Sequence, residues 1–329
     1  MGLQCKSILR LIGVALVTLI ATTTIHAQEY PSRPITLIVP FAAGGGTDAL
    51  ARIIAESMRR SLGQPIIIEN VAGATGSIGV GRAVRAAGDG YTLSIGTMST
   101  HVLSGALYAL SYDLLKDLTP VAQLATEPVL IVTKKSMPGN NLTELITWLK
   151  ANPDKISQGT PGVGSLGHVG GLLFQKETGT RFQFVPYRGS APAVQDLVAG
   201  QIDMMIDPLS TTLAQVRAGT IKAYAVVAKS RLAAAPEIPT ADEAGLVGVL
   251  PSQWFGLWVP AHTPKDIVGK LNAAIIDALA DPTVRARIAD LGQEVSPREK
   301  QTPEALAALQ KAEIEKWWPI IKEANIKTE

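Results

Sequence analysis

The sequence predicts an α/β protein with two lobes. Short β-branched apolar runs alternate with longer amphipathic stretches along most of the chain, which is the pattern of strands and helices in turn. The alternation restarts beyond Pro128, and roughly 300 residues can bury one or two sizeable cores, so two domains fit the length. The alternation at the start of the chain favours a mostly parallel sheet covered by helices.

The first lobe is expected to begin with a βαβαβ unit. Its apolar β-branched runs predict strands, and the amphipathic stretches between them predict helices. The strands are expected at 35–41, 66–71 and 91–96, and the helices at 48–62 and 77–87.

The second lobe continues the same alternation. Strands are expected at 129–134, 156–159, 182–186, 202–206 and 223–228, with helices at 142–152, 165–178, 191–199 and 210–218. Asn141, with Glu144 three residues later, has the pattern of a capping box for the first of these helices.

The chain is then expected to return to the first lobe. A strand at 254–259 leads into helices at 265–280 and 282–291, and Thr302 caps a last helix with Pro303 in its first turn. The predicted domains are a first lobe of residues 28–127 plus 254–329 and a second lobe of residues 128–253. Extended crossings at 128–134 and 253–261 would form the hinge between them.

The N-terminus has the layout of an export signal. Lys6 and Arg10 precede an apolar run at 11–20, and Ala27 ends the small-residue segment before the expected cut. The run is shorter than the ~20 residues that a membrane span needs. A cleaved signal peptide at 1–27 is therefore expected, and it removes the single cysteine, Cys5, so no disulfide or thiol chemistry is expected afterwards.

The charge balance argues against nucleic acid as a partner. The chain has 30 Lys+Arg and 28 Asp+Glu, and loss of Lys6 and Arg10 with the signal leaves 28 of each. A neutral chain without a basic run lacks the positive surface that binding to a phosphate backbone requires.

A glycine-rich loop between the first strand and first helix is the leading candidate for a binding site. The free N–H groups and the dipole of a helix start favour an anion, and glycines let the backbone approach it. The alternative is a tight turn capped by Thr47. The candidate ligand residues here are Phe41, Ala43, Gly44, Gly45, Gly46 and Thr47.

A second glycine-rich loop, at 159–168, precedes a predicted helix of the second lobe. It contains the spacing G-x-G-x-x-G, but the acidic residue that a dinucleotide site expects about 20 residues later is absent. The loop therefore predicts a second anion-binding helix start, sharing its ligand with the first loop across an interdomain cleft. Its candidate residues are Thr160, Gly162, Gly164 and Ser165, with His168 nearby.

Further polar candidates follow other strands. Thr97 and Ser99 end a first-lobe strand, and Gly189 and Asp207 follow second-lobe strands. Asp207 is either a helix N-cap or a carboxylate that faces an amine or hydroxyl of the ligand.

Nothing in the sequence assembles a catalytic or metal site. Beyond the signal there are three scattered histidines, no cysteine and no Gly-x-Ser-x-Gly motif. A binding protein without a cofactor or metal is expected rather than an enzyme.

Several of these motifs together resemble the Bug-type substrate-binding receptors of tripartite tricarboxylate transporters. They are the signal, Tyr30 to Ile35, the loop at 40–48, Asn70 to Gly76, the loop at 159–168, and Val185 to Gly189. The resemblance implies a periplasmic, two-domain Venus-flytrap fold of type II-like architecture with the ligand in the cleft. It also implies that Asp207 stands where relatives that accept an amino acid place an acid facing the amine.

The function expected from these observations is capture of a small carboxylate anion in the periplasm. The ligand would be a di- or tricarboxylate, an amino acid or an aromatic acid, and the membrane permease subunits of such a transporter would be the protein partners. A sensory receptor and an exported α/β hydrolase are the alternatives. A monomer is expected of a receptor that must close and reopen.

Overall fold

A computed structural model of the chain describes residues 30–228, 230–232, 235–246, 250 and 252–323. The predicted signal peptide lies outside these residues. The chain divides into two units between Ser32 and Arg33, and both sheets lie in the unit that begins at Arg33. Among the residues described, no helix combines the length and apolarity needed to cross a membrane.

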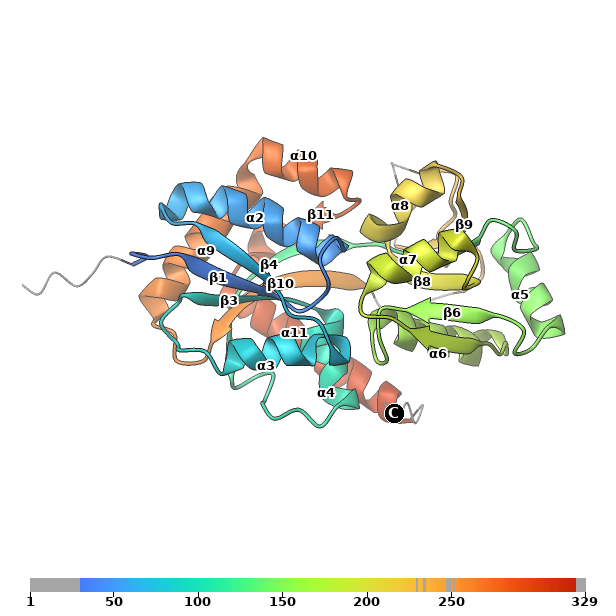
Figure 1. The fold of residues 1–329 in the computed structure, drawn as a ribbon, viewed down its shortest axis with the longest axis horizontal. Helices are drawn as coiled ribbons and strands as arrows, with labels where there is room; N and C mark the ends of the chain where they lie inside the picture. Colours follow the sequence, from blue (N-terminus) through green and yellow to red (C-terminus); the bar gives the residue numbers. More distant parts are fainter. Residues whose placement is uncertain (1–29, 229, 233–234, 247–249, 251, 324–329) are drawn as a thin grey trace, which may run out of the picture. The chain divides into compact units, whose positions relative to one another are not determined.

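The first lobe is built on a six-stranded mixed sheet (Figure 1). β1 pairs in parallel with β2 and β3, whereas β10 is antiparallel to β3 and β4, and β11 is antiparallel to β4. In the order of the sheet, the strands are β11 (Glu294–Val295), β4 (Leu118–Glu127), β10 (Gln253–Pro260), β3 (Thr92–Thr97), β1 (Ile35–Val39) and β2 (Ile66–Asn70).

The second lobe is built on a five-stranded mixed sheet. β6 is parallel to β7 and β8, and β5 is antiparallel to β8 and β9. In order, the strands are β7 (Gln183–Pro186), β6 (Ser157–Thr160), β8 (Met204–Pro208), β5 (Val129–Lys134) and β9 (Ile221–Val227).

The expectation of a mostly parallel sheet is therefore wrong for half of the first sheet. The helical crossovers produce parallel strands only in the βαβαβ unit at its start. β4 leads out of this sheet and β10 leads back into it, so the two strands run in opposite directions beside each other.

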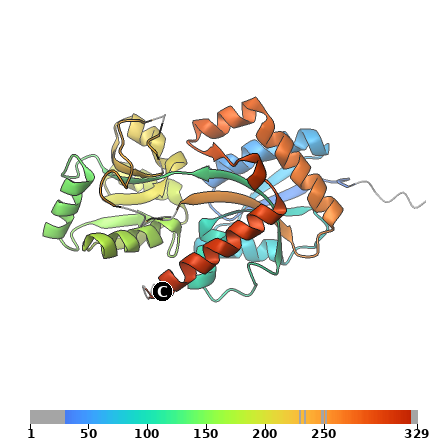
Figure 2. The same cartoon turned by 180° about the vertical axis from the view of Figure 1, so that it is seen from behind.

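Helices cover both faces of each sheet. In the first lobe α2, α9 and α10 pack together on one face, with α3, α4 and α11 on the other (Figures 1 and 2). Their bounds are α2 (Gly46–Leu62), α3 (Ser77–Val84), α4 (Ser104–Leu107), α9 (Lys265–Ala280), α10 (Pro282–Asp290) and α11 (Pro303–Glu323). In the second lobe they are α5 (Leu142–Ala151), α6 (Leu166–Thr178), α7 (Ser190–Ala199) and α8 (Leu209–Arg217).

Apolar side chains of the central strands form the core. Every residue of β10 is buried, and Trp258 in this strand is fully covered. Each buried aliphatic or aromatic side chain contributes about 1.5–3 kcal/mol through removal from water. The core thus fixes the central strands, and the strand ends carry the loops that line the candidate site.

The chain leaves the first sheet through β4 and enters the second through β5, with Pro128 alone between them. It returns to the first sheet with β10. We propose domain boundaries at 127/128 and 253/254, because the chain changes sheet at or within one residue of these positions.

The sequence pattern did not reveal β4. Gln123 and Glu127 interrupt its apolar character, and Pro120 lies inside it. Both polar side chains are nevertheless buried. The strand exists because β10 pairs along its whole length, which is a long-range contact that local periodicity does not record.

Two predicted helix starts are confirmed. The Asn141 side chain accepts from Glu144 N at 2.9 Å, and Glu144 Oε2 accepts from Asn140 N at 2.8 Å. Thr302 Oγ1 accepts from Ala305 N at 3.1 Å at the start of α11. Local side-chain chemistry therefore sets the first turns of α5 and α11.

The cap of α5 gives a test of the fold. We expect Asn141→Ala to lower the free energy of unfolding by about 1 kcal/mol, because the N–H of Glu144 loses its acceptor. Urea unfolding followed by circular dichroism measures the change. Asn140→Ala, at the exposed neighbouring residue, is the control, and an equal loss in the two variants would contradict the assignment.

Candidate ligand site

A cavity lies where the loop after β1 meets the starts of α7 and α8. Its empty volume is about 580 Å³, a figure that includes open solvent. Residues of both lobes line it: Phe41, Ala42, Gly45, Gly46, Thr47, Ser99, Glu127, Pro161, Leu166, Gly167, Gly189, Ser190, Ala191, Pro208, Ser210, Thr211, Gln253 and Phe255.

The start of α2 presents backbone N–H groups at this cavity. Gly45 is its N-cap residue and, having no side chain, provides no cap hydrogen bond. The N–H groups in the first turn of a helix have no acceptor within the helix. Gly46 and Thr47 belong to this turn and line the cavity, so an anionic oxygen placed there would satisfy them.

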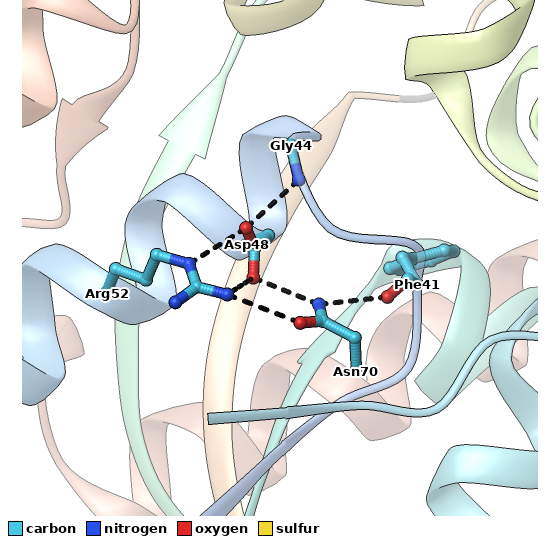
Figure 3. Close-up of polar contacts among 5 residues, drawn as sticks. All are labelled: Phe41, Gly44, Asp48, Arg52 and Asn70. Carbon is cyan, nitrogen blue, oxygen red and sulfur yellow. Dashed lines mark hydrogen bonds and ion pairs between the residues drawn. The ribbon is translucent and has the colours of Figure 1, made fainter. Parts of the chain in front are cut away.

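A network of polar contacts holds the loop before α2 in place (Figure 3). Asp48 Oδ2 accepts from Gly44 N at 3.0 Å, and Asn70 Nδ2 donates to Phe41 O at 3.1 Å and to Asp48 Oδ1 at 2.9 Å. Arg52 donates to both oxygens of Asp48. Gly44 itself has a φ of +88°, a conformation that glycine adopts without strain.

The network also keeps the Asp48 carboxylate ionised. Burial acts to raise its pKa, but the hydrogen bonds from Arg52, Gly44 and Asn70 outweigh burial and lower the pKa. The negative charge of Asp48 is compensated by these three hydrogen-bond donors. The Asp48 carboxylate accepts from these groups rather than from the N–H groups of Gly46 and Thr47, the two α2 residues that line the cavity.

α2 and α8 approach each other closely at Gly46. A Cβ atom at this position would lie 1.9 Å from Ser210 Oγ and 2.9 Å from Ser210 Cβ. Any side chain there would require Ser210 to move. Gly46 thus permits a direct contact between an element of the first lobe and an element of the second.

The second glycine-rich loop makes several polar contacts within itself. Ser165 caps α6 by accepting from His168 N at 3.3 Å, and His168 Nδ1 accepts from Gly164 N at 3.0 Å. Thr160 Oγ1 donates to Gly162 O at 3.3 Å. Burial lowers the pKa of His168 to about 4, so its ring is neutral at pH 7.

Three side chains of the first lobe hydrogen-bond the backbone of this loop. Ser99 Oγ accepts from Leu166 N at 3.0 Å, and Tyr108 Oη donates to Val163 O at 2.6 Å. Thr75 Oγ1 donates to the same carbonyl. The second loop is therefore docked on the first lobe, and the Leu166 N–H at the start of α6 already has an acceptor.

Asp207 does not line the cavity, but it holds two hydroxyls that do. Its carboxyl accepts from Ser190 Oγ at 2.9 Å and from Thr211 Oγ1 at 2.6 Å. Burial raises the pKa of this carboxyl to about 7. Pro208 is the N-cap residue of α8, so Asp207, the fourth residue of β8, is not the helix cap that was one alternative.

The structure brings six of the predicted residues to the cavity and leaves nine outside its lining. Those that line it are Phe41, Gly45, Gly46, Thr47, Ser99 and Gly189. Those outside are Ala43, Gly44, Thr97, Thr160, Gly162, Gly164, Ser165, His168 and Asp207. Gly162 instead lines a neighbouring cavity together with Thr75 and Tyr108.

Glu127 is a cavity residue that sequence reasoning missed. It is only 2% exposed; its Oε1 accepts from Ser210 N, and its Oε2 accepts from Gln293 Nε2 at 3.1 Å. Burial raises its pKa to about 8, which the hydrogen bonds from Ser210 and Gln293 only partly offset. The one local feature that could have identified Glu127 is its position directly before Pro128, where the chain crosses to the second sheet.

The described residues of the structure support neither a metal site nor a catalytic histidine at this cavity. Among the described residues there is no group of three or more His, Cys, Asp and Glu side chains placed to hold a metal ion. His101 is fully buried and stacks on Trp258 with ring centroids 3.9 Å apart. Burial lowers the pKa of His101 to about 3, so this ring is a neutral part of the core.

Two sheets with helices on both faces and a cavity lined from both lobes define a two-lobed solute-binding protein. Residues 50–326 match the profile of the tripartite tricarboxylate transporter family receptors. The chain belongs to this family. This confirms the family resemblance, the two-lobed fold and the expectation of a solute-binding receptor rather than an enzyme.

Solved structures of relatives agree with this assignment. The periplasmic binding protein BugD aligns with a TM-score of 0.87 and 37% identity, covering 91% of this chain and 100% of BugD. MatC from Rhodopseudomonas palustris with bound malate gives 0.85 and 41%, covering 89% and 100%. A second R. palustris protein, with adipate, gives 0.86 and 34%, covering 91% and 99%.

The buried carboxyl of Glu127 predicts a pH dependence of stability. Its pKa rises from 4.5 to about 8 on folding, so the folded protein keeps a proton that the unfolded chain releases within this range. The contribution of Glu127 to stability should therefore fall as pH rises from 4.5 to 8. Glu127→Gln cannot ionise and should lose less stability than the wild type over this range.

Urea unfolding at pH 5 and pH 8 measures this difference. Asp207, whose pKa is also raised by burial, adds a loss in both proteins, and His101 and His168, whose pKa values are lowered by burial, add a gain in both, so the difference between the two proteins reports on Glu127. Glu294→Gln, at an exposed residue of the neighbouring β11, should behave as the wild type. If Glu127→Gln lost as much stability as the wild type, Glu127 would not be the titrating group.

Proposed function

We propose that the protein captures a small carboxylate anion in the periplasm for uptake by a tripartite tricarboxylate-type permease. The observation that carries the proposal is the uncapped start of α2, whose Gly46 and Thr47 line the cavity. A carboxylate there would accept hydrogen bonds from N–H groups that lack an acceptor within the helix. Hydrogen bonds to a charged group contribute about 1.5–3 kcal/mol each.

Other lining residues support an anionic ligand. The Ser99 hydroxyl accepts from Leu166 N, which leaves its own proton for an oxygen of the ligand. Phe41 and Phe255 add apolar surface, and among the described residues no Lys or Arg lines the cavity. The negative charge would thus be bound by backbone and hydroxyl dipoles rather than by an ion pair.

The relatives with ligands point to the same chemical class. Malate is bound to MatC and adipate accompanies the second R. palustris protein, and both are dicarboxylates. We propose the same class of ligand for the present chain. We also propose that the predicted residues outside the lining shape the site from behind it; they are Ala43, Gly44, Thr97, Thr160, Gly162, Gly164, Ser165, His168 and Asp207.

Location and partners are part of the proposal. Export would follow cleavage of residues 1–27, whose basic head and apolar run have the pattern of a signal. Permease subunits would receive the ligand after the lobes separate. The hydrogen bonds of Ser99, Thr75 and Tyr108 to the second glycine-rich loop are the contacts that such a separation would break.

A thermal-melt screen of the mature protein against mono-, di- and tricarboxylates tests the proposal. A ligand at a hundredfold excess over its Kd should stabilise the protein by about 2.7 kcal/mol, and the melting temperature should rise accordingly. The protein is first unfolded, dialysed and refolded so that copurified ligand is removed. No rise with any acid would overturn the proposal.

Gly46→Ala should weaken binding of the acid found in this screen by at least about tenfold, because its Cβ would meet Ser210 and displace the start of α2. Calorimetric titration measures the change. Gly269→Ala, inside α9 with no atom near the added Cβ, is the matched control and should bind as the wild type does. Equal affinity in Gly46→Ala and the control would place the carboxylate elsewhere.

A further inference from the structure

Glu127 is the only titratable side chain among the described residues that line the cavity. It is buried, and its described hydrogen-bond partners are the Ser210 N–H and the side-chain amide of Gln293. Both partners are uncharged. A buried carboxylate loses its hydration, and without a cation beside it the neutral acid is favoured.

The described surroundings of Glu127 in the second lobe and on β10 are neutral or acidic. Gln253 lies opposite Glu127 on β10, and Ser210 contacts it from the first turn of α8. The negative charge of Asp207, on β8, raises the pKa of Glu127 further. The Ser210 N–H acts in the opposite direction, but burial outweighs it.

Two charged groups of the first lobe flank this position. Glu294 of β11 pairs with Thr126, the residue before Glu127, but its side chain is exposed to solvent. Asp48, in the first turn of α2, is paired with Arg52. Water screens the first acid and Arg52 compensates the second, so neither supplies the cation that a charged Glu127 would need.

The proposed carboxylate position lies beside Glu127. A Cβ atom on Gly46 would be 1.9 Å from Ser210 Oγ and 3.5 Å from Gln293 Nε2, and both of these residues hydrogen-bond to Glu127. A carboxylate at the first N–H groups of α2 would therefore be about one hydrogen-bonded group away from Glu127. Two carboxylates that share a buried site repel each other, so that one of them binds a proton.

Glu127, rather than the ligand, is the acid that this environment protonates. The N–H donors at the start of α2 stabilise the charged form of the ligand carboxylate. Burial has the opposite effect on Glu127 and favours its neutral form. Once protonated, Glu127 also has an O–H group that can donate to an oxygen of the ligand. Repulsion between the two acids is then replaced by attraction.

We infer that Glu127 is a ligand-binding residue that acts as a neutral carboxylic acid, and that capture of an anion by protein with an ionised Glu127 takes up one proton. The proton comes from water or buffer and stays on a carboxyl oxygen of Glu127 until the ligand leaves. This inference rests on the proposed function and adds to it a dependence of affinity on pH.

The direction of the pH dependence follows from linkage. The pKa of Glu127 is about 8 without ligand, and the charge of a bound anion raises it further. Well below pH 8 the free protein already holds the proton, so affinity should not change with pH. Above pH 8 the proton has to be taken up on binding, and the Kd should be about tenfold higher at pH 9 than at pH 7.

Calorimetric titration in buffers of different ionisation enthalpy counts the protons. The probe is the acid found in the melt screen, provided that all its carboxyl groups are ionised at pH 7. The slope of the observed enthalpy against the buffer ionisation enthalpy gives the number of protons taken up. We expect about 0.5 to 1 at pH 8.5 and close to zero at pH 6.

Three variants locate the proton. Glu127→Gln keeps a neutral hydrogen-bonding side chain, so it should bind within about threefold of the wild type at pH 7 and take up no proton at pH 8.5. Asp207→Asn should still take up the proton, because Asp207 lies outside the lining and is engaged by Ser190 and Thr211. Glu294→Gln is the exposed control and should behave as the wild type does.

The results separate this inference from the proposed function. Proton uptake that is lost only in Glu127→Gln supports the inference. Binding without uptake by the wild type at pH 8.5 overturns it while the proposed function stands, and this result needs no variant to fold. Uptake that is lost in Asp207→Asn but kept in Glu127→Gln also overturns it. Binding of no acid at all overturns the proposed function as well.

Discussion

Unsatisfied backbone N–H groups at the start of α2 are the constraint around which the site is organised. A side-chain cap would normally supply their acceptor, but Gly45 at the N-cap position has no side chain. The residues next to this helix start leave the acceptor to be supplied by a ligand. Asp48 carries the only carboxylate of the first turn, and its contacts to Gly44, Arg52 and Asn70 hold it behind the loop.

The same helix start determines how the two lobes meet. Gly46 allows α8 to approach, and Glu127 then accepts from Ser210 N in the first turn of α8. Glu127 is the last residue of β4, directly before the chain crosses to the second sheet. One carboxyl group therefore connects the crossing, the second lobe and, through Gln293, the segment before β11.

Buried acids near an anion site would be unfavourable if both were fully charged. Burial raises the pKa of Glu127 and of Asp207, so each carboxyl is more readily protonated than in water. Asp207 is also fully engaged by Ser190 and Thr211. The site thus reduces repulsion of a ligand carboxylate by neutralising its own acids.

Much of this arrangement was predictable from local sequence. Three glycines between a strand and an amphipathic helix predict an anion-binding turn, and Gly45 and Gly46 of that turn line the cavity. The helix caps at Asn141 and Thr302 were also predictable from neighbouring residues alone. β4, the antiparallel half of the first sheet and Glu127 were not, because each depends on pairing with β10 or on contact with α8, more than 80 residues away.

The second glycine-rich loop shows a different limit of prediction from sequence. Its composition suited an anion site, yet Ser165 caps its own helix and the Leu166 N–H is bound by Ser99. Sequence spacing identified a helix start with free N–H groups but could not tell whether a ligand or a residue of the other lobe satisfies them. Only the three-dimensional contacts distinguish these cases.

The most direct test of the account is a crystal structure of the mature protein with an acid identified by the melt screen. The account predicts a carboxylate oxygen within hydrogen-bonding distance, about 3.2 Å or less, of Gly46 N or Thr47 N. A carboxylate bound away from the start of α2, with these N–H groups facing water, would contradict it.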